Sequence, residues 1–343
     1  MKKILAVLLF ISAAASAADK KILLRGSETS FTANDHAVAR YQKAAGDRAD
    51  IIVARTQEEF ERHVVDAHGV LGGINKEQFA KAKNLEWVQS SSAGVEAYTF
   101  WPEFVESDVK LTNCKVVQGP SVADHALALF LALARGLQTY IPDMETQTWK
   151  SRAEAPETIR ELQGMTAVVV GVGGIGTQIA QRLHGFGISV IGVDPRDIPV
   201  SNYVPIVVKP DAVDRVLPKA DAVFIAAPLT PESENMIGAR QFDLMKDDAY
   251  FIVISRGGLY DREALVKSLD SGKLRGVGLD VTRPEPLPED HALWRFKNVI
   301  ITPHMASLSE AANGRRLDVM VDNVGRFAHG RPLVNLVDKD AGY

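Results

Sequence analysis

Short apolar runs alternate with segments of helical periodicity through the second half of the chain. The runs lie at 166–172, 189–193, 222–227, 250–254, 277–281 and 299–302. They are apolar at nearly every position and rich in β-branched residues, which is typical of parallel strands buried on both faces. Between them, 261–269 reads as a helix that Asp261 caps and Gly272 follows. This βα alternation predicts a doubly wound parallel sheet.

A smaller set of apolar runs precedes this region. They lie at 22–24, 51–54, 70–71, 85–88 and 116–117, with polar or helical segments between them. They predict a small α/β domain with its own parallel sheet. A helix is expected to start at Ser121, with Asp124 in an acidic variant of the capping box. Its segment 126–134 is almost wholly apolar, which favours burial between domains or subunits.

The chain ends in another amphipathic segment, 306–328, which we expect to return to the first domain. The predicted organisation is therefore a discontinuous substrate domain, 19–119 with 306–343, and a cofactor domain, 120–305. The fold class is α/β: a Rossmann cofactor domain plus a smaller flavodoxin-like domain. We expect the cleft between the two domains to hold the site.

The N-terminus follows another pattern. Met1-Lys2-Lys3 is positive, 4–11 is apolar, and Ala15-Ser16-Ala17 is a small-x-small cleavage motif. This predicts a secretory signal peptide over residues 1–18, with a mature start near Ala18 and no membrane anchor after cleavage. The alternative is an edge strand or first helix. Export predicts a periplasmic or secreted protein; a non-functional signal would leave it cytoplasmic.

Composition narrows the function classes. The chain has 343 residues, 46% of them apolar, and a net charge of −4, with no basic stripe to indicate a nucleic-acid partner. Cys114 is the only cysteine, so an intramolecular disulfide and a cysteine-based zinc site are excluded. It lies in a strand-like segment and is expected to be a buried, inert thiol. No metal site is predicted.

The most informative motif follows the run at 166–172. Gly171, Gly173 and Gly176 form a G-x-G-x-x-G pattern, with Gly174 and Ile175 between them, and a helical pattern opens there. Such glycines permit the tight turn, the approach of a pyrophosphate, and close packing of helix on strand. The free N–H groups at the helix start can hold the phosphates. A plain glycine-rich turn is the alternative.

A second strand, 189–193, ends at Asp194, about 20 residues beyond the glycines. A carboxylate at this place can accept the ribose hydroxyls, so the chain is predicted to bind a nicotinamide dinucleotide. The charge of Asp194 favours NAD over NADP, because it repels a 2′-phosphate. Arg196 lies two residues on, and its charge weakens that preference unless it is only a solvated loop residue. NADP therefore remains possible.

Three later segments lie at the carboxyl ends of predicted strands, where ligands bind in such folds. They are Ile254-Ser255-Arg256, the stretch from Asp280 to Glu285, and Thr302-Pro303-His304. Each delivers one polar residue that suits a 2-oxo acid. Arg256 can bind its carboxylate and polarise its ketone. His304 can protonate the ketone oxygen as hydride arrives, and Glu285 can orient the imidazole.

Each of these residues also has an ordinary explanation when taken alone. Arg256 could be a surface ion-pair partner, Glu285 a loop acid in a proline-rich stretch, and His304 a satisfied core or capping residue. Their order after three strands, beside a dinucleotide motif, favours catalysis.

Several segments resemble the D-isomer-specific 2-hydroxyacid dehydrogenases. They are GVGGIG, SRGGLYDREALVKSLDSGKLRGVGLDV, EPLP, LW and NVIITPHMAS. The resemblance runs from about Lys21 to the end, and the ending LVNLVDK…GY is similar to the glyoxylate/hydroxypyruvate-reductase-like branch. It implies an NAD(P)-dependent oxidoreductase acting on a small 2-oxo or D-2-hydroxy acid, and usually a homodimer formed through the cofactor domain.

The resemblance also implies roles for single residues. It gives Arg256, Glu285 and His304 the catalytic roles above. Substrate would be bound at Ala93, Gly94 and Val95 through backbone N–H groups, with Gly73 in a second wall. The adenine side would be lined by Ala227 and Pro228, and Asp280 would contact the nicotinamide carboxamide.

The chain departs from the family pattern in three places: Val253 replaces a common Asn, Asp124 replaces a common Glu, and the apparent signal peptide is unusual. A non-catalytic dinucleotide-binding protein of the same fold is the main alternative. A dehydrogenase of a phosphorylated substrate is a further one. It is disfavoured because the only lysines in 70–98, at positions 76, 81 and 83, lie on one helix-like segment.

Overall fold

The computed structural model describes residues 20–151 and 159–343, so the predicted signal peptide lies outside the described residues. The chain divides into two compact units. One holds the chain up to Gln89 with Met320–Val334, and the other holds Ser90–Val319 with Asn335–Tyr343. Both units are discontinuous. The predicted domain boundaries, at 119/120 and 305/306, differ from this division and stay a prediction.

The first sheet has five strands in the order β2-β1-β3-β4-β5. Its strands are β1 (Lys20–Arg25), β2 (Ala49–Ala54), β3 (Gly69–Leu71), β4 (Trp87–Gln89) and β5 (Lys110–Thr112). The pairs β1–β2, β1–β3 and β3–β4 are parallel. Three helices follow its strands, namely α1 (Asp35–Ala45), α2 (Gln57–His63) and α3 (Lys76–Lys81). The core of the unit that holds the chain up to Gln89 includes four buried side chains, Ile22, Tyr41, Phe60 and Trp87.

The second sheet has seven strands in the order β12-β11-β10-β9-β6-β7-β8, all paired in parallel. Its strands are β6 (Thr166–Val170), β7 (Ser189–Val193), β8 (Ile206–Val208), β9 (Ala222–Ile225), β10 (Ala249–Val253), β11 (Leu274–Leu279) and β12 (Val299–Ile301). The chain runs from β6 outward to β8, then crosses back to β9 and runs to β12. This is the strand order of a Rossmann sheet, with a switch point between β6 and β9. The predicted doubly wound fold is confirmed.

The other helices are α4 (Glu96–Thr99), α5 (Pro102–Val105), α6 (Gly119–Ala134), α7 (Leu137–Glu145), α8 (Gly174–Gly185), α9 (Val213–Val216), α10 (Ala239–Leu244), α11 (Arg262–Asp270) and α12 (Glu310–Ala328). Short 3₁₀ turns lie at Val64–Asp66, Pro210–Ala212, Leu217–Lys219, Gly257–Leu259 and Ala292–Arg295. Within the described ranges, no helix is long and apolar enough to cross a bilayer.

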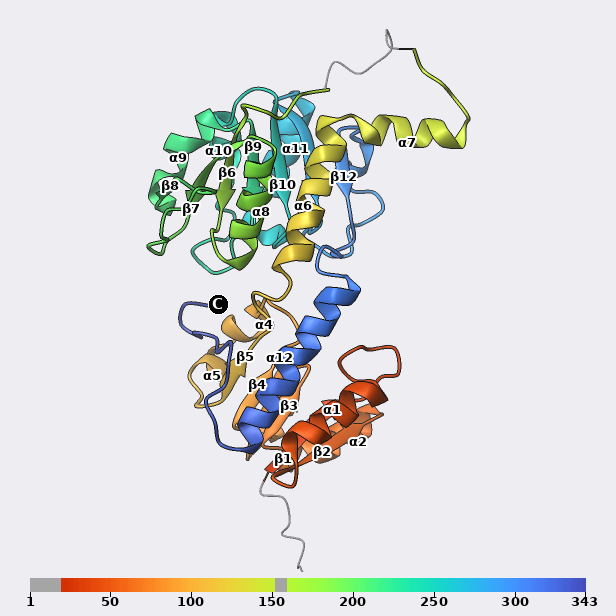
Figure 1. Cartoon of the computed structure of the whole chain (residues 1–343), viewed down its shortest axis with the longest axis vertical. Coiled ribbons are helices and arrows are strands. Elements are labelled where there is room, and N and C mark those ends of the chain that lie inside the picture. Colours follow the sequence, from red (N-terminus) through yellow and green to blue (C-terminus); the bar gives the residue numbers. More distant parts are fainter. Residues whose placement is uncertain (1–19, 152–158) are drawn as a thin grey trace, which may run out of the picture. The chain divides into compact units, whose positions relative to one another are not determined.

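The alternation of side chains along each strand divides the core of the second sheet into two layers. In β6, Val168 and Val170 belong to one apolar cluster, and Ala167 and Val169 belong to the other. The first cluster includes residues of α9, α10 and α11, and the second includes residues of α6 and α8. Helices therefore cover both faces of this sheet (Figure 1).

The apolar composition of helix α6 is explained by its packing within its own unit. It packs against α8, β10 and β11 in the same unit, and the ring of Phe130 meets Phe224 and Tyr250 edge-on. Its burial therefore needs neither a second domain nor a second subunit.

Some local predictions were wrong. Val116 is 66% exposed with φ 77°, so 116–117 is a turn, and the fifth strand is β5 instead. Two apolar residues do not specify a strand without neighbours to pair with. Helix α6 begins at Gly119 rather than Ser121. Asp124 does not form a capping box. Its Oδ1 accepts a hydrogen bond from Nε of Arg182 on α8 at 2.7 Å. Strand β8 and helix α7 were not predicted.

Candidate active site

The glycine turn lies directly after β6, at the switch point of the second sheet. Gly171 has φ +88°, and a Cβ there would lie 2.6 Å from the backbone of Ala227 at the end of β9. A Cβ on Gly176 would lie 1.9 Å from the carbonyl oxygen of Gly171. Side chains at these two positions would collide with backbone, so the turn requires glycine.

The start of α8 fits a dinucleotide phosphate. Gly173 precedes the helix and supplies no side-chain cap, and Gly174 and Ile175 are its first two residues. The atom nearest to a Cβ on Gly173 would be Nη2 of Arg196, 3.5 Å away. The helix start therefore offers backbone N–H groups and a nearby cation to an anion. These residues fit the pyrophosphate of a nicotinamide dinucleotide.

Asp194, the residue after β7, lies beside the glycine turn. Its side chain is 3% exposed and accepts hydrogen bonds from Val172 N at 2.9 Å and from Arg196 N at 2.9 Å. It also pairs with Nε of Arg196 at 3.2 Å, and this hydrogen bond raises the pKa of the Arg196 guanidinium. The negative charge of Asp194 is thus balanced by a guanidinium that is 51% exposed. The ring of Tyr343 lies 5.6 Å from Cζ of Arg196.

Arg256 follows β10, after Ile254 and Ser255. Its Nε donates to Oε1 of Glu96 at 2.6 Å, and its Nη1 donates to the carbonyl oxygen of Ser255 at 2.6 Å. Its Nη2 lies against Gly94, where a Cβ would be only 1.5 Å away. The side chain is 20% exposed. The guanidinium is therefore held on two sides and presents its Nη2 to the turn at 93–95.

That turn has its own supports. Asn113 donates through Nδ2 to the carbonyl oxygen of Ala93 at 2.7 Å, and Cys114 N donates to the carbonyl oxygen of Ser92 at 3.0 Å. Val95 precedes α4, which starts at Glu96. Cys114 is fully buried, and burial raises the pKa of its thiol to about 12. The predicted burial of this thiol is confirmed, and its low reactivity stays a prediction, which the raised pKa supports because the thiolate is the reactive form.

His304 follows β12 and pairs with Glu285. Nδ1 of His304 lies 2.8 Å from Oε2 of Glu285, and Oε1 of Glu285 accepts from Thr282 N at 3.0 Å. Both side chains are partly exposed, at 44% and 39%. With Glu285 ionised, Nδ1 donates to it, so Nε2 is the nitrogen suited to proton exchange with a substrate.

Asp280 fixes the backbone that carries His304. Its carboxylate is 1% exposed and accepts from Thr302 Oγ1 at 2.6 Å, Met305 N at 2.9 Å and Ala306 N at 2.9 Å. His304 N donates to the carbonyl oxygen of Asp280 at 2.8 Å. His304 has φ 52°, a left-handed conformation that such a network can stabilise. The predicted contact of Asp280 with a carboxamide stays a prediction.

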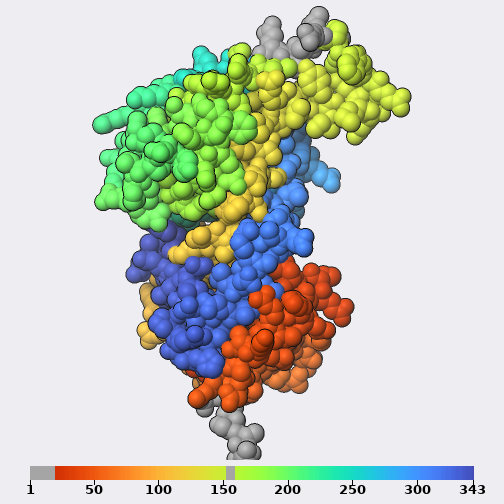
Figure 2. Space-filling model, in the orientation of Figure 1, coloured from red at the N-terminus to blue at the C-terminus, as the bar shows by residue number. Residues whose placement is uncertain are grey.

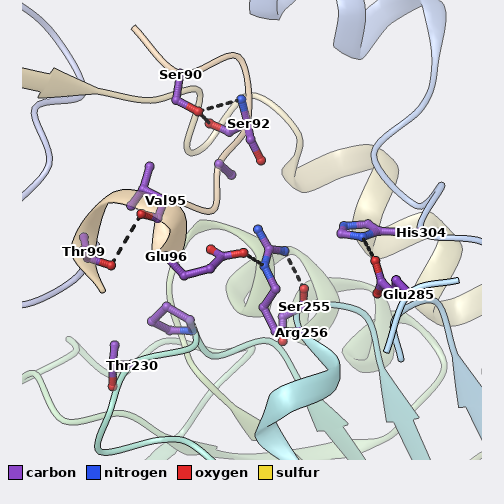
Figure 3. Close-up of polar contacts among 12 residues, drawn as sticks. Ser90, Ser92, Val95, Glu96, Thr99, Thr230, Ser255, Arg256, Glu285 and His304 are labelled. Carbon is purple, nitrogen blue, oxygen red and sulfur yellow. Dashed lines mark hydrogen bonds and ion pairs between the residues drawn. The ribbon is translucent and has the colours of Figure 1, made fainter. Parts of the chain in front are cut away.

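The structure places most of the predicted residues in one unit. Figure 3 shows Arg256 between Glu96 on one side and the His304–Glu285 pair on the other. The turn at 93–95, the glycine turn and Asp194 belong to the same unit. This unit also contains Ala227, Pro228, Ile254 and Ser255. The carbonyl oxygen of Pro228 accepts from Ser233 Oγ at 2.8 Å, and Oγ of Ser255 donates to the carbonyl oxygen of Ile225 at 3.2 Å. Gly73 lies in the other unit, with φ +123°.

Sequence reasoning missed two functional candidates. Glu96 was not predicted as a functional residue. The only signal for it in the sequence is that an acid stands two residues after Gly94. The loop-holding role of Asp280 also escaped, because its donors come from residues 302–306, far along the chain.

Comparison with known proteins identifies the relatives of this chain. The family model described as "D-isomer specific 2-hydroxyacid dehydrogenase, NAD binding domain" matches residues 127–306. A glyoxylate reductase of Thermofilum pendens is 32% identical over 291 residues, which cover 83% of this chain and 85% of that protein. Two longer relatives are D-3-phosphoglycerate dehydrogenases, and the chain spans 52% and 56% of their lengths.

Solved structures give the same result. A D-isomer specific 2-hydroxyacid dehydrogenase family protein of Aeromonas salmonicida has a TM-score of 0.79 and 30% identity, covering 94% of this chain and 100% of its own. A family member of Xanthobacter autotrophicus, solved with NADPH and MES, has a TM-score of 0.78 and 26% identity. It covers 95% of this chain and 100% of its own.

Proposed function

Because the chain belongs to the D-isomer specific 2-hydroxyacid dehydrogenase family of NAD(P)-dependent oxidoreductases, we propose that it reduces a small 2-oxo acid to the D-2-hydroxy acid. The substrate has the size of glyoxylate or hydroxypyruvate. One observation carries the proposal: the His304–Glu285 pair occurs in the same unit as Arg256 and the glycine turn. An acid/base pair, a carboxylate-binding cation and a dinucleotide subsite are what this reaction requires.

We assign each of these residues a role in the reaction according to its charge. Nη2 of Arg256 and the backbone N–H groups of the turn at 93–95 bind the substrate carboxylate and polarise the oxo group. The bound nicotinamide supplies the hydride. Protonated His304 gives the proton from Nε2 to the carbonyl oxygen, and Glu285 stabilises the imidazolium and keeps its orientation. In the reverse direction neutral His304 takes the hydroxyl proton.

The test is to replace His304 with Gln. We expect turnover with glyoxylate or hydroxypyruvate and NADH to fall about 10²–10⁴-fold, while NADH binding, followed by its fluorescence, is retained. His329→Gln, at an exposed position beyond α12, is the matched control and should keep native turnover. Unchanged turnover of His304→Gln would refute the assigned proton donor. NADH binding by the native protein without oxidation by any of a panel of 2-oxo acids would favour a non-catalytic binding protein.

We also propose that NADH is preferred to NADPH by a modest factor. The buried carboxylate of Asp194 opposes a 2′-phosphate, whereas its partner Arg196 attracts one. The two charges largely cancel, which supports use of both cofactors.

A homodimer is a further part of the proposal. Leu137, Ile141 and Met144 on α7 and Trp149 beyond it are 46%, 58%, 77% and 96% exposed. Figures 1 and 2 show α7, in yellow-green, extending away from the rest of its unit. An apolar extension of this kind suits an interface with a second copy. Ile141→Glu with Trp149→Glu should shift the sedimentation coefficient from dimer to monomer; an unshifted dimer would exclude this surface.

The N-terminal pattern supports a proposal of export to the periplasm or outside the cell. N-terminal sequencing of the protein from fractionated cells tests it. A start near Ala18 in the exported fraction is expected, and an intact Met1 in the cytosolic fraction would refute it.

A further inference from the structure

Among the residues that the structure describes, Glu96 is the acidic side chain that pairs with the predicted substrate-binding cation, Arg256. Its Oε1 accepts from Nε of Arg256 at 2.6 Å, and its side chain is 32% exposed. It comes from the first residue of α4, whereas Arg256 follows β10, so the pair joins two segments 160 residues apart. Figure 3 shows the carboxylate facing the guanidinium.

The pair determines which edge of the guanidinium faces the turn. Nε is bound by Glu96 and Nη1 by the carbonyl oxygen of Ser255. A Cβ on Gly94 would lie 1.5 Å from Nη2 of Arg256 and 2.7 Å from Oε2 of Glu96. Nη2 of Arg256 and Oε2 of Glu96 therefore both pack against Gly94, where only a glycine leaves room for them.

Charge at this place is nearly balanced before substrate binds. Arg256 contributes one positive charge and Glu96 one negative charge, and Glu285 holds a second carboxylate beside His304. One substrate carboxylate can be bound by Nη2 of Arg256 and the backbone of the turn. A second carboxylate or a phosphate on the substrate would be repelled by the carboxylate of Glu96, and Arg256 is already paired with that carboxylate. Arg283, a cation close along the chain to Glu285, is paired with Glu234.

We propose that Glu96 is a positioning and specificity-determining residue that restricts the site to 2-oxo acids with a single negative charge. It holds the guanidinium plane through Nε, and its charge disfavours dianionic substrates. Oε2 can accept a hydrogen bond from a hydroxyl on the third carbon, which favours a substrate such as hydroxypyruvate over oxaloacetate. The inference rests on the proposed function and names its substrate class.

The experiment compares kcat/KM for glyoxylate, hydroxypyruvate, oxaloacetate and 3-phosphohydroxypyruvate, with NADH, in the native protein and in Glu96→Gln. Gln keeps an acceptor for Nε of Arg256 and removes the charge. We expect the ratio of kcat/KM for oxaloacetate to that for glyoxylate to rise about tenfold or more. Glu103→Gln, an exposed acid on α5 in the same unit, is the matched control and should leave this ratio unchanged.

A second variant separates positioning from charge. Glu96→Ala removes the acceptor as well, and we expect it to lower kcat/KM for every 2-oxo acid by about tenfold relative to Glu96→Gln. Equal effects of the two variants would overturn the positioning role, and an unchanged charge ratio in Glu96→Gln would overturn the specificity role. Failure of the native protein to oxidise NADH with any of the four acids is a different result, and it would overturn the proposed function itself.

Discussion

Gly94→Ala is predicted to lower the catalytic efficiency strongly without unfolding the protein. The new methyl group would lie 1.5 Å from Nη2 and 2.5 Å from Cζ of Arg256. Ordinary contact needs about 3.5 Å, so the guanidinium has to move by about 2 Å. Arginine is a long, flexible side chain, so its displacement leaves the fold intact. We expect the free energy of unfolding to fall by about 1.5–3 kcal/mol, because the charge-assisted bond to Glu96 is lost.

The catalytic cost is larger because two interactions are lost together. Displacement breaks the charge-assisted bond to Glu96 and withdraws Nη2 from the position of the substrate carboxylate. Such bonds contribute about 1.5–3 kcal/mol each, and about 1.4 kcal/mol corresponds to a tenfold change. We therefore expect kcat/KM for glyoxylate to fall about 10²–10⁴-fold, mostly through KM.

Steady-state kinetics and a thermal melt test this together. Gly314→Ala, on α12, is the control, because a Cβ there meets nothing within 4 Å, and it should keep native kinetics. A Gly94→Ala protein with native melting temperature and kcat/KM within about threefold of native would refute the placement of Arg256 at the substrate turn. A protein that fails to fold would contradict the moderate cost assigned to moving Arg256.

Three further outcomes are expected. Cys114 should not react with a thiol reagent at pH 8 in the native state, since its pKa is about 12 and its side chain is buried, but should react fully in denaturant; rapid native reaction would contradict its burial. Arg196→Ala should raise the preference for NADH over NADPH about threefold to tenfold in kcat/KM, because Asp194 loses its counter-charge; an unchanged ratio would remove Arg196 from the cofactor subsite. Asp280→Ala should lower the free energy of unfolding by about 2–5 kcal/mol in urea titration, because one buried and two partly buried donors lose their acceptor, and a smaller loss would contradict that network.

The sequence was most informative where one local pattern excludes others. The glycines at 171 and 176 were predictable because their turn leaves no space for a side chain, and the structure places backbone where each Cβ would be. The continuous apolar runs predicted every strand of the second sheet except β8, since only strands covered on both faces tolerate such runs. Asp261 was predicted as an N-cap and accepts from Ala264 N at 3.0 Å.

Prediction failed where the decisive partner is far along the chain. Asp124 was expected to cap its own helix, but Arg182 on α8 takes its carboxylate. Val116 was expected in a strand, but the chain turns there with a positive φ. Local propensities differ by about 1 kcal/mol or less, so a single tertiary contact can outweigh them.

The sequence alone therefore determined the fold class, the dinucleotide motif and the identities of the three polar residues after strands, because these depend on local sterics and burial. Tertiary structure decided what those residues touch: Glu96 on Arg256, Glu285 on His304, and Asp280 beneath the loop that carries His304. The Glu285 and Asp280 contacts join the segments after β11 and β12, which are neighbours in the sheet. The Glu96 contact joins α4 to the segment after β10. The spacing of motifs along the chain encodes none of these contacts.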